Sequence, residues 1–274
     1  MLEPSPSPHR PRISTRPPFP RILCALDEGA GTDEAIEQAI AVAGPDARIV
    51  FAANWYGRGS AERAAEADAH ARAAVEAAVE RAEAAGVEAR AELFHGPRLV
   101  DALLRAAASH DLVVVGAHSH ARITGIVLGE LATQLVHTSP IPVLVAREPQ
   151  LATGLVAATR AWPRDRIALT KATHIAARLG AELTVVHVHE PDDFKRQPEL
   201  DAELANVRAL LGRQIDHYLA TGPAARAIVD VAEGDGAGLV VVGSDQRRGL
   251  SALASVSERV AHLAPCSVLV MRAT

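Results

Sequence analysis

The chain has 274 residues, of which 49% are hydrophobic but only 3% aromatic, so it is long enough to build two domains with aliphatic cores. Its formal net charge of −5 leaves no basic surplus of the kind that nucleic-acid binding requires. It has no apolar run near the roughly 20 residues of a membrane-spanning helix and no apolar secretion signal at its N-terminus. We therefore expect a cytoplasmic protein with neither a membrane nor a nucleic acid as partner.

Residues 1–20 differ in composition from the rest of the chain. They are rich in proline, serine and arginine and contain few side chains that can form a core. Such a composition is typical of a disordered tail. We therefore expect the folded part to begin at Arg21.

Residues 21–148 alternate the patterns of strands and helices. Apolar runs indicate strands, and apolar residues at helical spacing between a capping residue and a glycine indicate helices. Asp68 and Arg72 are spaced for an i,i+4 ion pair. The expected elements are a strand from Arg21 to Asp27, a helix over 32–44 with Thr32 as N-cap, a strand from Arg48, a helix over 60–86 capped by Ser60, a strand over 87–94, a helix starting at Pro97, a strand over 112–116, a helix over 129–138 and a strand over 142–145.

Residues 153–274 repeat this order less regularly. The segments GPRLVDALLRAAASHDLVVVG and GPAARAIVDVAEGDGAGLVVVG both lead from Gly-Pro through a helical pattern into LVVVG. The closing runs SPIPVLVAR, from Ser139, and APCSVLVMR, from Ala264, start 125 residues apart. The chain is therefore expected to hold two copies of one unit. The expected elements of the second are a strand over 155–159, a helix over 164–179, a strand from Glu182, a helix over 198–211, a strand over 214–220, a helix after Gly222, the strand LVVVG, a helix over SVSERV and a closing strand.

Strands that alternate with helices predict a parallel sheet covered by helices on both faces. Ligands of such folds bind beyond the carboxyl ends of the strands, where the strand order reverses. Asp27 and Gly116 each follow a strand, so we expect a ligand beside them.

The motifs RILCALD, DLVVVG, SPIPVLV and APCSVLV together resemble those of the universal stress protein family, in a tandem two-domain form. The resemblance implies two doubly wound five-stranded parallel-sheet α/β domains, Rossmann-like and similar to the adenine nucleotide alpha hydrolases, over residues 21–148 and 153–274. It also implies self-association through the last strands, around Val143 and Val268, either within the chain as a pseudo-dimer or between two copies.

The family's ATP-binding members carry G-x2-G-x9-G-[S/T] after the fourth strand, where glycines and a helix N-terminus expose backbone amides to phosphates. Here the motif has Ser119 as its second position and Glu130 as its last. The Glu130 carboxylate would cap the helix, or pair with Arg122, and would repel a triphosphate. If ATP binds, Asp27 is expected on its ribose or adenine side, and the backbone amides that would contact it are those of Gly116, Ala117, Ser119, Gly129 and Glu130.

The second unit departs further from the motif. Gln246 and Ala254 replace two glycines, although Ser255 supplies the hydroxyl. Thr159 is expected at the position of Asp27. His187, near the end of a strand, is expected to be satisfied by local hydrogen bonds.

The sequence indicates neither catalytic residues nor a metal site. His118, Ser119 and His120 lack an orienting acid and a third ligand. Cys24 and Cys266 lie in or beside apolar runs and are expected to be buried thiols without a disulfide.

The resemblance implies a regulatory or binding protein of stress adaptation with weak or no ATP binding. The alternatives are an ATP-binding switch with slow hydrolysis and a nucleotide-free dimerisation scaffold.

Overall fold

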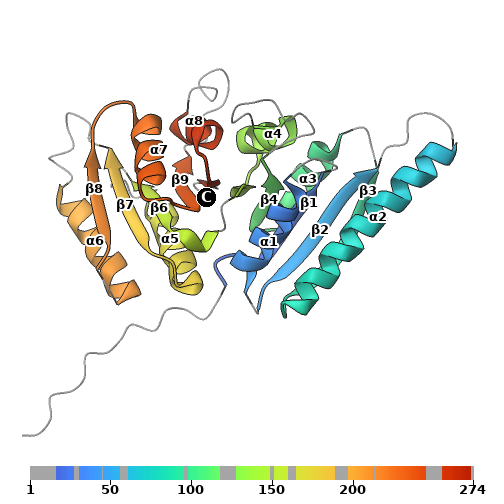
Figure 1. Ribbon diagram of the computed structural model, residues 1–274, viewed down its shortest axis with the longest axis horizontal. Helices are drawn as coiled ribbons and strands as arrows, with labels where there is room; N and C mark the ends of the chain where they lie inside the picture. The colour runs from blue at the N-terminus through green and yellow to red at the C-terminus, as the bar shows by residue number, and fades with distance from the viewer. Residues whose placement is uncertain are drawn as a thin grey trace, which may run out of the picture.

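A computed structural model describes residues 17–27, 31–44, 46–55, 61–95, 98–117, 128–148, 151–159, 165–188, 197–212, 214–244 and 255–272 (Figure 1). Residues 17–148 are called half one below, and residues 151–272 half two. The elements of half one are β1 (Arg21–Leu26), α1 (Thr32–Ala43), β2 (Arg48–Trp55), α2 (Ala61–Ala84), β3 (Glu88–His95), α3 (Leu99–Ala107), β4 (Leu112–Gly116), α4 (Glu130–Thr138) and β5 (Val143–Ala146).

Half two repeats this order after the short 3₁₀ helix η1 (Leu151–Thr153). Its elements are β6 (Leu155–Thr159), α5 (Asp165–Leu179), β7 (Leu183–Val188), α6 (Gln197–Leu211), β8 (Asp216–Ala220), α7 (Ala224–Gly234), β9 (Leu239–Ser244), α8 (Val256–Leu263) and β10 (Ser267–Arg272). The α/β alternation predicted from the apolar runs is therefore confirmed in both halves.

The described strands form one ten-stranded sheet in the order β3-β2-β1-β4-β5-β10-β9-β6-β7-β8. All neighbours within each half are parallel, and only β5 and β10 pair antiparallel, with Leu144 opposite Leu269. Figure 1 shows the two halves side by side, with β3 and β8 far apart at the outer edges. The tandem doubly wound fold and the internal pseudo-dimer predicted from the sequence are both confirmed.

This strand order decides how the last strands associate. β5 lies between β4 and β10, and β10 lies between β5 and β9. Neither strand has a free edge, so a second copy of the chain cannot pair through them. The last strands thus join the two halves of one chain, and their pairing between copies, the other expected mode, is excluded in this arrangement.

Helices cover both faces of the sheet and divide the core into two layers. One layer packs α1, α2, α5 and α6 against the sheet, and the other packs α3, α4, α7 and α8 against the opposite face. Both layers consist mainly of alanine, valine, leucine and isoleucine side chains. This agrees with a core that has very few aromatic residues to fill it.

The disordered tail was predicted over residues 1–20, but its last four residues, 17–20, belong to the folded part. Phe19 is 1% exposed and belongs to the core layer of α1 and α5. The amide of Arg48 donates to the carbonyl of Pro20 at 2.9 Å, and Lys171 of half two donates to the carbonyl of Pro18. One aromatic anchor therefore orders residues 17–20, while residues 1–16 lie outside the described part.

Of three helix starts predicted from the sequence, the structure describes one, that of α1. Thr32 is not the N-cap of α1, because its hydroxyl donates to the carbonyl of Asp27 at 2.6 Å and Gly31 occupies the cap position. Ser60 and Pro97, predicted to start two other helices, lie outside the described residues. The predicted Asp68–Arg72 ion pair is present at 3.4 Å.

Both cysteines are buried and free, as expected. Burial raises the pKa of the Cys266 thiol to about 11, and it raises the pKa of Cys24 as well. Both therefore remain protonated packing residues at neutral pH. Among the described helices, none is both long enough and apolar enough to cross a lipid bilayer.

Candidate functional site

The strand order of half one places a candidate site between β1 and β4. The chain runs outward from β1 through β2 to β3, and then returns to the other side of β1 as β4 and β5. The order therefore reverses between β1 and β4, and a ligand crevice is expected beyond their carboxyl ends. Asp27 directly follows β1 and Ala117 directly follows β4, so two predicted site residues lie at this edge.

Two glycines bring the backbones of this edge into contact. Gly31, with φ of 104°, precedes α1 and lies against Gly116 at the end of β4. A Cβ added to Gly116 would lie only 2.5 Å from the carbonyl oxygen of Gly31. Gly116 therefore has a structural role that requires no phosphate. Gly31, which the sequence reasoning did not single out, is its partner.

Two of the amides expected to contact a nucleotide are already used within the protein. The amide of Ala117 donates to the carbonyl of Ala146 at 2.9 Å, and the amide of Gly129 donates to the carbonyl of Ala117 at 2.8 Å. The expectation that these two amides face a ligand is therefore wrong in this conformation. The hydrogen bond from Gly129 to Ala117 instead holds the start of α4 beside the end of β4.

Among the described residues, the N-terminus of α4 has no side-chain cap. Gly129 is the N-cap residue, and no described side chain accepts a hydrogen bond from the amides of the first turn. The Glu130 carboxylate instead accepts from the side-chain amide of Gln134 at 2.9 Å. Glu130 thus does not cap the helix, contrary to expectation, and the amides of the first turn have no acceptor inside the helix. Ser119 and Arg122 lie outside the described residues.

The matching helix of half two closes its own N-terminus. Ser255 is the N-cap residue of α8, and its hydroxyl accepts from the amide of Glu258 at 3.3 Å. The hydroxyl expected to bind phosphate in half two is therefore engaged in capping. The two halves differ at this point, because Ser255 caps α8 whereas no described side chain caps α4.

The first strand of half two also ends differently from β1. The two LVVVG strands pair with β1 and β6 so that Ile22 and Leu155 hold equivalent positions. Counting forward, Asp27 corresponds to Arg160 and not to Thr159, which corrects the expected match by one residue. Arg160 itself lies outside the described residues.

A buried polar cluster lies at the carboxyl ends of β6 and β7. Glu203 of α6 is 3% exposed, accepts from the Thr159 hydroxyl at 3.2 Å and pairs with Arg166 at 3.4 Å. His187 makes a hydrogen bond with the Thr159 carbonyl at 3.1 Å, as expected for a locally satisfied strand histidine. Protein side chains thus satisfy one another beside β6 and β7 at this edge of half two. Glu203 was not predicted from the sequence. Its position among the buried residues of α6, next to Leu204, is the sequence feature that could have indicated it.

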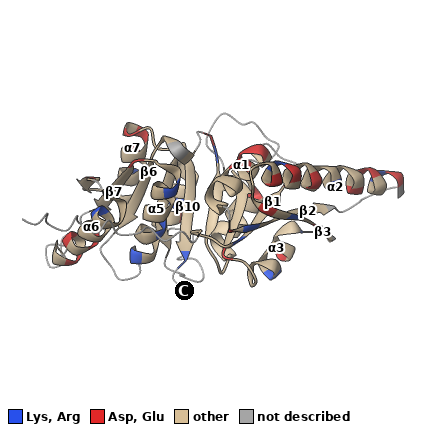
Figure 2. Ribbon diagram, turned by 90° about the horizontal axis from the view of Figure 1, so that it is seen from below, with Lys and Arg blue, Asp and Glu red and all other residues tan. Residues whose placement is uncertain are grey.

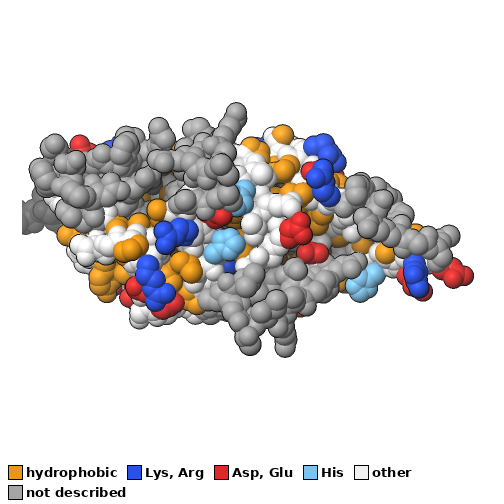
Figure 3. Space-filling view, turned by 90° about the horizontal axis from the view of Figure 1, so that it is seen from above, with side chains coloured by type: hydrophobic (Ala, Val, Ile, Leu, Met, Phe, Trp, Pro, Cys, Tyr) orange, Lys and Arg blue, Asp and Glu red, His pale blue; other side chains and the backbone are white. Residues whose placement is uncertain are grey.

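The two halves also meet through α4 and α8. His137 Nε2 lies 2.8 Å from a carboxylate oxygen of Glu258, and both side chains are mostly buried. Figure 3 shows histidine and acidic side chains gathered near the middle of this face. The contact belongs to the seam between the halves, and no clustered set of acidic, histidine and cysteine side chains suited to a metal occurs in the described part.

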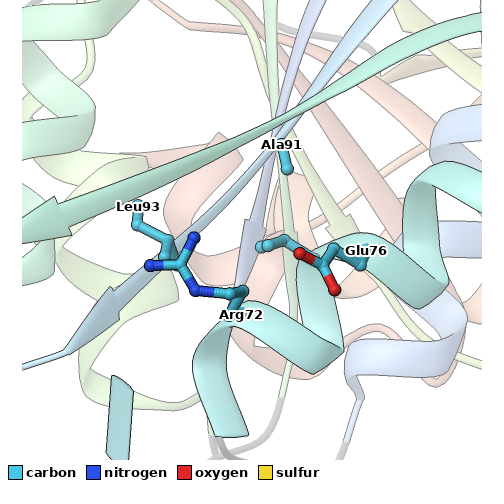
Figure 4. Close-up of a pocket in the computed structure, with 5 residues that line it drawn as sticks. Arg72, Glu76, Ala91 and Leu93 are labelled. Atoms are coloured by element: carbon cyan, nitrogen blue, oxygen red, sulfur yellow. The ribbon is translucent and has the colours of Figure 1, made fainter. Parts of the chain in front are cut away.

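A small hollow between α2 and β3 lies away from this edge. Arg72 and Glu76 of α2 and Ala91 and Leu93 of β3 line it (Figure 4). Arg72 is engaged with Asp68, as described above. None of the residues predicted for a nucleotide lines this hollow, so it is no candidate for that site.

The model of the universal stress protein family matches residues 18–147 and again residues 155–272. The chain belongs to the universal stress protein family. Universal stress proteins of Mycobacterium bovis and Mycobacterium tuberculosis are each 41% identical to it over 46 residues, which is 17% of this chain and 16% of theirs. The aligned part thus spans well under two thirds of those relatives.

Solved structures agree with the tandem fold. A universal stress protein from Archaeoglobus fulgidus matches with a TM-score of 0.75 and 20% identity, covering 93% of this chain and 97% of its own. A Pseudomonas aeruginosa protein of unknown function matches with a TM-score of 0.71 and 19% identity, covering 93% of both chains. At these identities the similarity concerns the fold alone. The role of this tandem universal stress protein therefore has to be inferred from its own residues at the carboxyl ends of its strands.

Proposed function

We propose that this universal stress protein is a regulatory binding protein without rapid turnover. In this proposal half one binds an adenine nucleotide weakly, and half two is closed to it. The proposal is supported by the contrast between the two helix ends, since no described side chain caps α4 whereas Ser255 caps α8. A helix N-terminus with unused amides favours an anion, and one that a serine already caps offers less.

Charge limits the affinity in this proposal. Glu130 stands in the first turn of α4, where a carboxylate competes with a phosphate for the positive end of the helix. Its hydrogen bond to Gln134 draws it along the helix but leaves its charge within one turn of the site. The expected result is binding that is weak but present, with Asp27 on the ribose or adenine side.

The first test asks whether nucleotide copurifies with the native protein. Heat release followed by ion-pair chromatography with mass detection would quantify it, and calorimetry with added ATP–Mg²⁺ would give the affinity. We expect little copurified nucleotide and millimolar to high-micromolar binding. Glu130→Gln should tighten ATP binding about three- to tenfold, because it removes one negative charge beside the phosphates.

Two controls assign the binding to half one. Glu199→Gln removes the same charge from the first turn of α6 and should leave ATP binding unchanged. Ser255→Ala opens the cap of α8 and should also leave it unchanged. If neither the wild type nor Glu130→Gln binds ATP at millimolar concentration, the nucleotide role is rejected and a nucleotide-free scaffold remains. Slow release of ADP during the titration would favour the switch instead.

A further inference from the structure

A second cavity lies at the seam of the two halves and shares no lining residue with the predicted nucleotide site. It has a volume of about 520 Å³, within the usual range of small-molecule sites. Half one contributes α1 and the end of α2, half two contributes the end of α5, and Arg147, Glu148 and Leu151 line it from the segment that follows β5. The polar residues of its lining are Glu34, Glu37, Gln38, Arg81, Arg147 and Glu148.

The cavity combines an apolar lining with carboxylates. Ile40, Ala41, Leu151 and Leu179 come from both halves and give it an apolar wall that no single half could supply. Three glutamates stand around this wall. Figure 2 shows acidic residues repeating along α1 and α2, the two helices of half one that border it.

The two arginines of the cavity both make hydrogen bonds within the protein. Arg81 lies 2.6 Å from Asp33 and 3.2 Å from Glu37. The guanidinium of Arg147 donates instead to the backbone carbonyls of Ala261 and Cys266. Carboxylates therefore offset the charge of Arg81, whereas Arg147 keeps its charge, is 4% exposed, and its Nε has no hydrogen-bond partner among the described residues. The three glutamates of the lining still outnumber the two arginines.

Two of the carboxylates remain without a basic partner. Within the described part of the chain, no ion pair joins Glu34 or Glu148 to a basic side chain, whereas Glu37 shares Arg81. Glu34 belongs to α1 and Glu148 to the connector, so they stand on different elements around one apolar wall. An apolar wall with unpaired carboxylates beside it is complementary to a molecule with an apolar body and a positive end.

We propose that this seam pocket binds a small organic ammonium ion with an apolar body. The body packs against Ile40, Leu151 and Leu179, and the ammonium group lies toward Glu34 and Glu148. The site shares no residue with the predicted nucleotide site and does not depend on the proposed function. Because both halves line it, the bound ion favours the paired arrangement of the halves, by mass action.

The test uses the full-length protein with labelled alanine and leucine methyl groups. The probes are 2-phenylethylammonium and hexylammonium, each compared with its neutral alcohol and its carboxylate of similar size. Two-dimensional NMR titration should show shifts at the methyl groups of Ala41, Ala84, Leu151 and Leu179. Both ammonium ions should bind at least about threefold more tightly than the matched alcohols, as expected of partly exposed charge pairs.

Single substitutions then assign the charge. Glu34→Gln and Glu148→Gln should each weaken ammonium binding about threefold. Glu233→Gln is the matched control, because it removes one exposed carboxylate from α7 on the other face of the sheet and should change nothing. The proposal is overturned if neither ammonium ion shifts the pocket methyl groups at millimolar concentration, if the alcohols or carboxylates bind as tightly, or if both glutamine variants bind like the wild type.

Discussion

At the scale of single residues, Gly116 shows how one position can carry a structural and a ligand-related role. Its place after LVVVG fits the first glycine of a phosphate-binding loop. The structure gives it an independent reason, because the carbonyl of Gly31 occupies the space that a Cβ would need. A glycine at this position is therefore no evidence that phosphate binds.

Replacing Gly116 tests this packing role directly. We expect Gly116→Ala to lower the free energy of unfolding by about 1–3 kcal/mol, because the added Cβ meets backbone that cannot easily move. Urea denaturation would measure the change. Gly234→Ala at the end of α7 is the control, since a Cβ there meets nothing within 4 Å, and it should be neutral or slightly stabilising. Equal stability of the two variants would show that the β1–β4 edge can relax.

His262 gives the pH dependence of the seam a definite sign. Burial lowers its pKa, Arg147 and His137 lower it further, and Glu258 opposes them. The folded state therefore favours the neutral ring, so this stability is complete above the unfolded pKa of about 6.5 and is lost as the pH falls through the lower folded value.

The free energy of unfolding should accordingly decrease between about pH 7 and pH 5. His262→Gln should flatten part of this slope, and the remainder belongs in part to His174 and His217, whose pKa values burial also lowers. His70→Gln on the exposed face of α2 should leave the slope unchanged. Urea denaturation across this range would measure it, and a stability that rises on acidification would contradict the assignment.

At the scale of elements, the segment before β1 shows how a single aromatic side chain extends the fold. Phe19 is buried in the core layer, and the ammonium group of Lys171 from α5 lies 4.9 Å from its ring centre. The segment thus joins half one to a helix of half two. Composition alone assigned it to a tail because three of its four residues, 17–20, are prolines.

Truncating this anchor should destabilise the whole chain. Phe19→Ala is expected to lower the free energy of unfolding by about 3–5 kcal/mol, as for other large-to-small changes in a core. Lys171→Met should lower it by only about 1–2 kcal/mol, since it removes a cation–π contact and the hydrogen bond to the Pro18 carbonyl but leaves the ring buried. Chemical denaturation would rank the two. A loss below that of Lys171→Met would mean that the segment only rests on the surface.

The elements themselves were predictable, and the contacts between them were less so. Strands such as LVVVG are continuous apolar runs, and sequence periodicity alone locates them. The cap of α1 was not predictable, because the hydroxyl of Thr32 has a partner in Asp27 that only the folded loop brings near. At the candidate site too, the elements were predictable, since the ends of β1 and β4 lie where the sequence predicted them. The engagement of Ala117 with Ala146, however, depends on how β4 and β5 pair.

At the scale of the whole molecule, the seam follows the internal repeat. Arg147 directly follows β5 and Arg272 ends β10, the last strands of the two halves. The two arginines are 125 residues apart. Arg147 donates to the carbonyl of Ala261 across the seam, and Arg272 donates to that of Val136, which are again 125 residues apart. Each half thus places one arginine on the carbonyl of an equivalent helix in the other half. The pseudo-symmetric exchange fixes the halves with charge-assisted hydrogen bonds as well as with the β5–β10 ladder.

These two arginines should be the strongest polar determinants of the seam. Burial lowers the pKa of Arg147 to about 10, so it remains charged at neutral pH while buried. Arg147→Met and Arg272→Met each remove a buried charge, which is stabilising, but they also leave buried carbonyls without donors, which is destabilising. The second effect should be larger, so each variant should lower the free energy of unfolding by about 1–3 kcal/mol. Hydrogen exchange should then quicken in β5 and β10 ahead of β2 and β7. Arg90→Met, on the exposed face of β3, should change the free energy of unfolding by less than about 0.5 kcal/mol. If the seam variants behave like Arg90→Met, the antiparallel strands hold the halves together without help from the arginines.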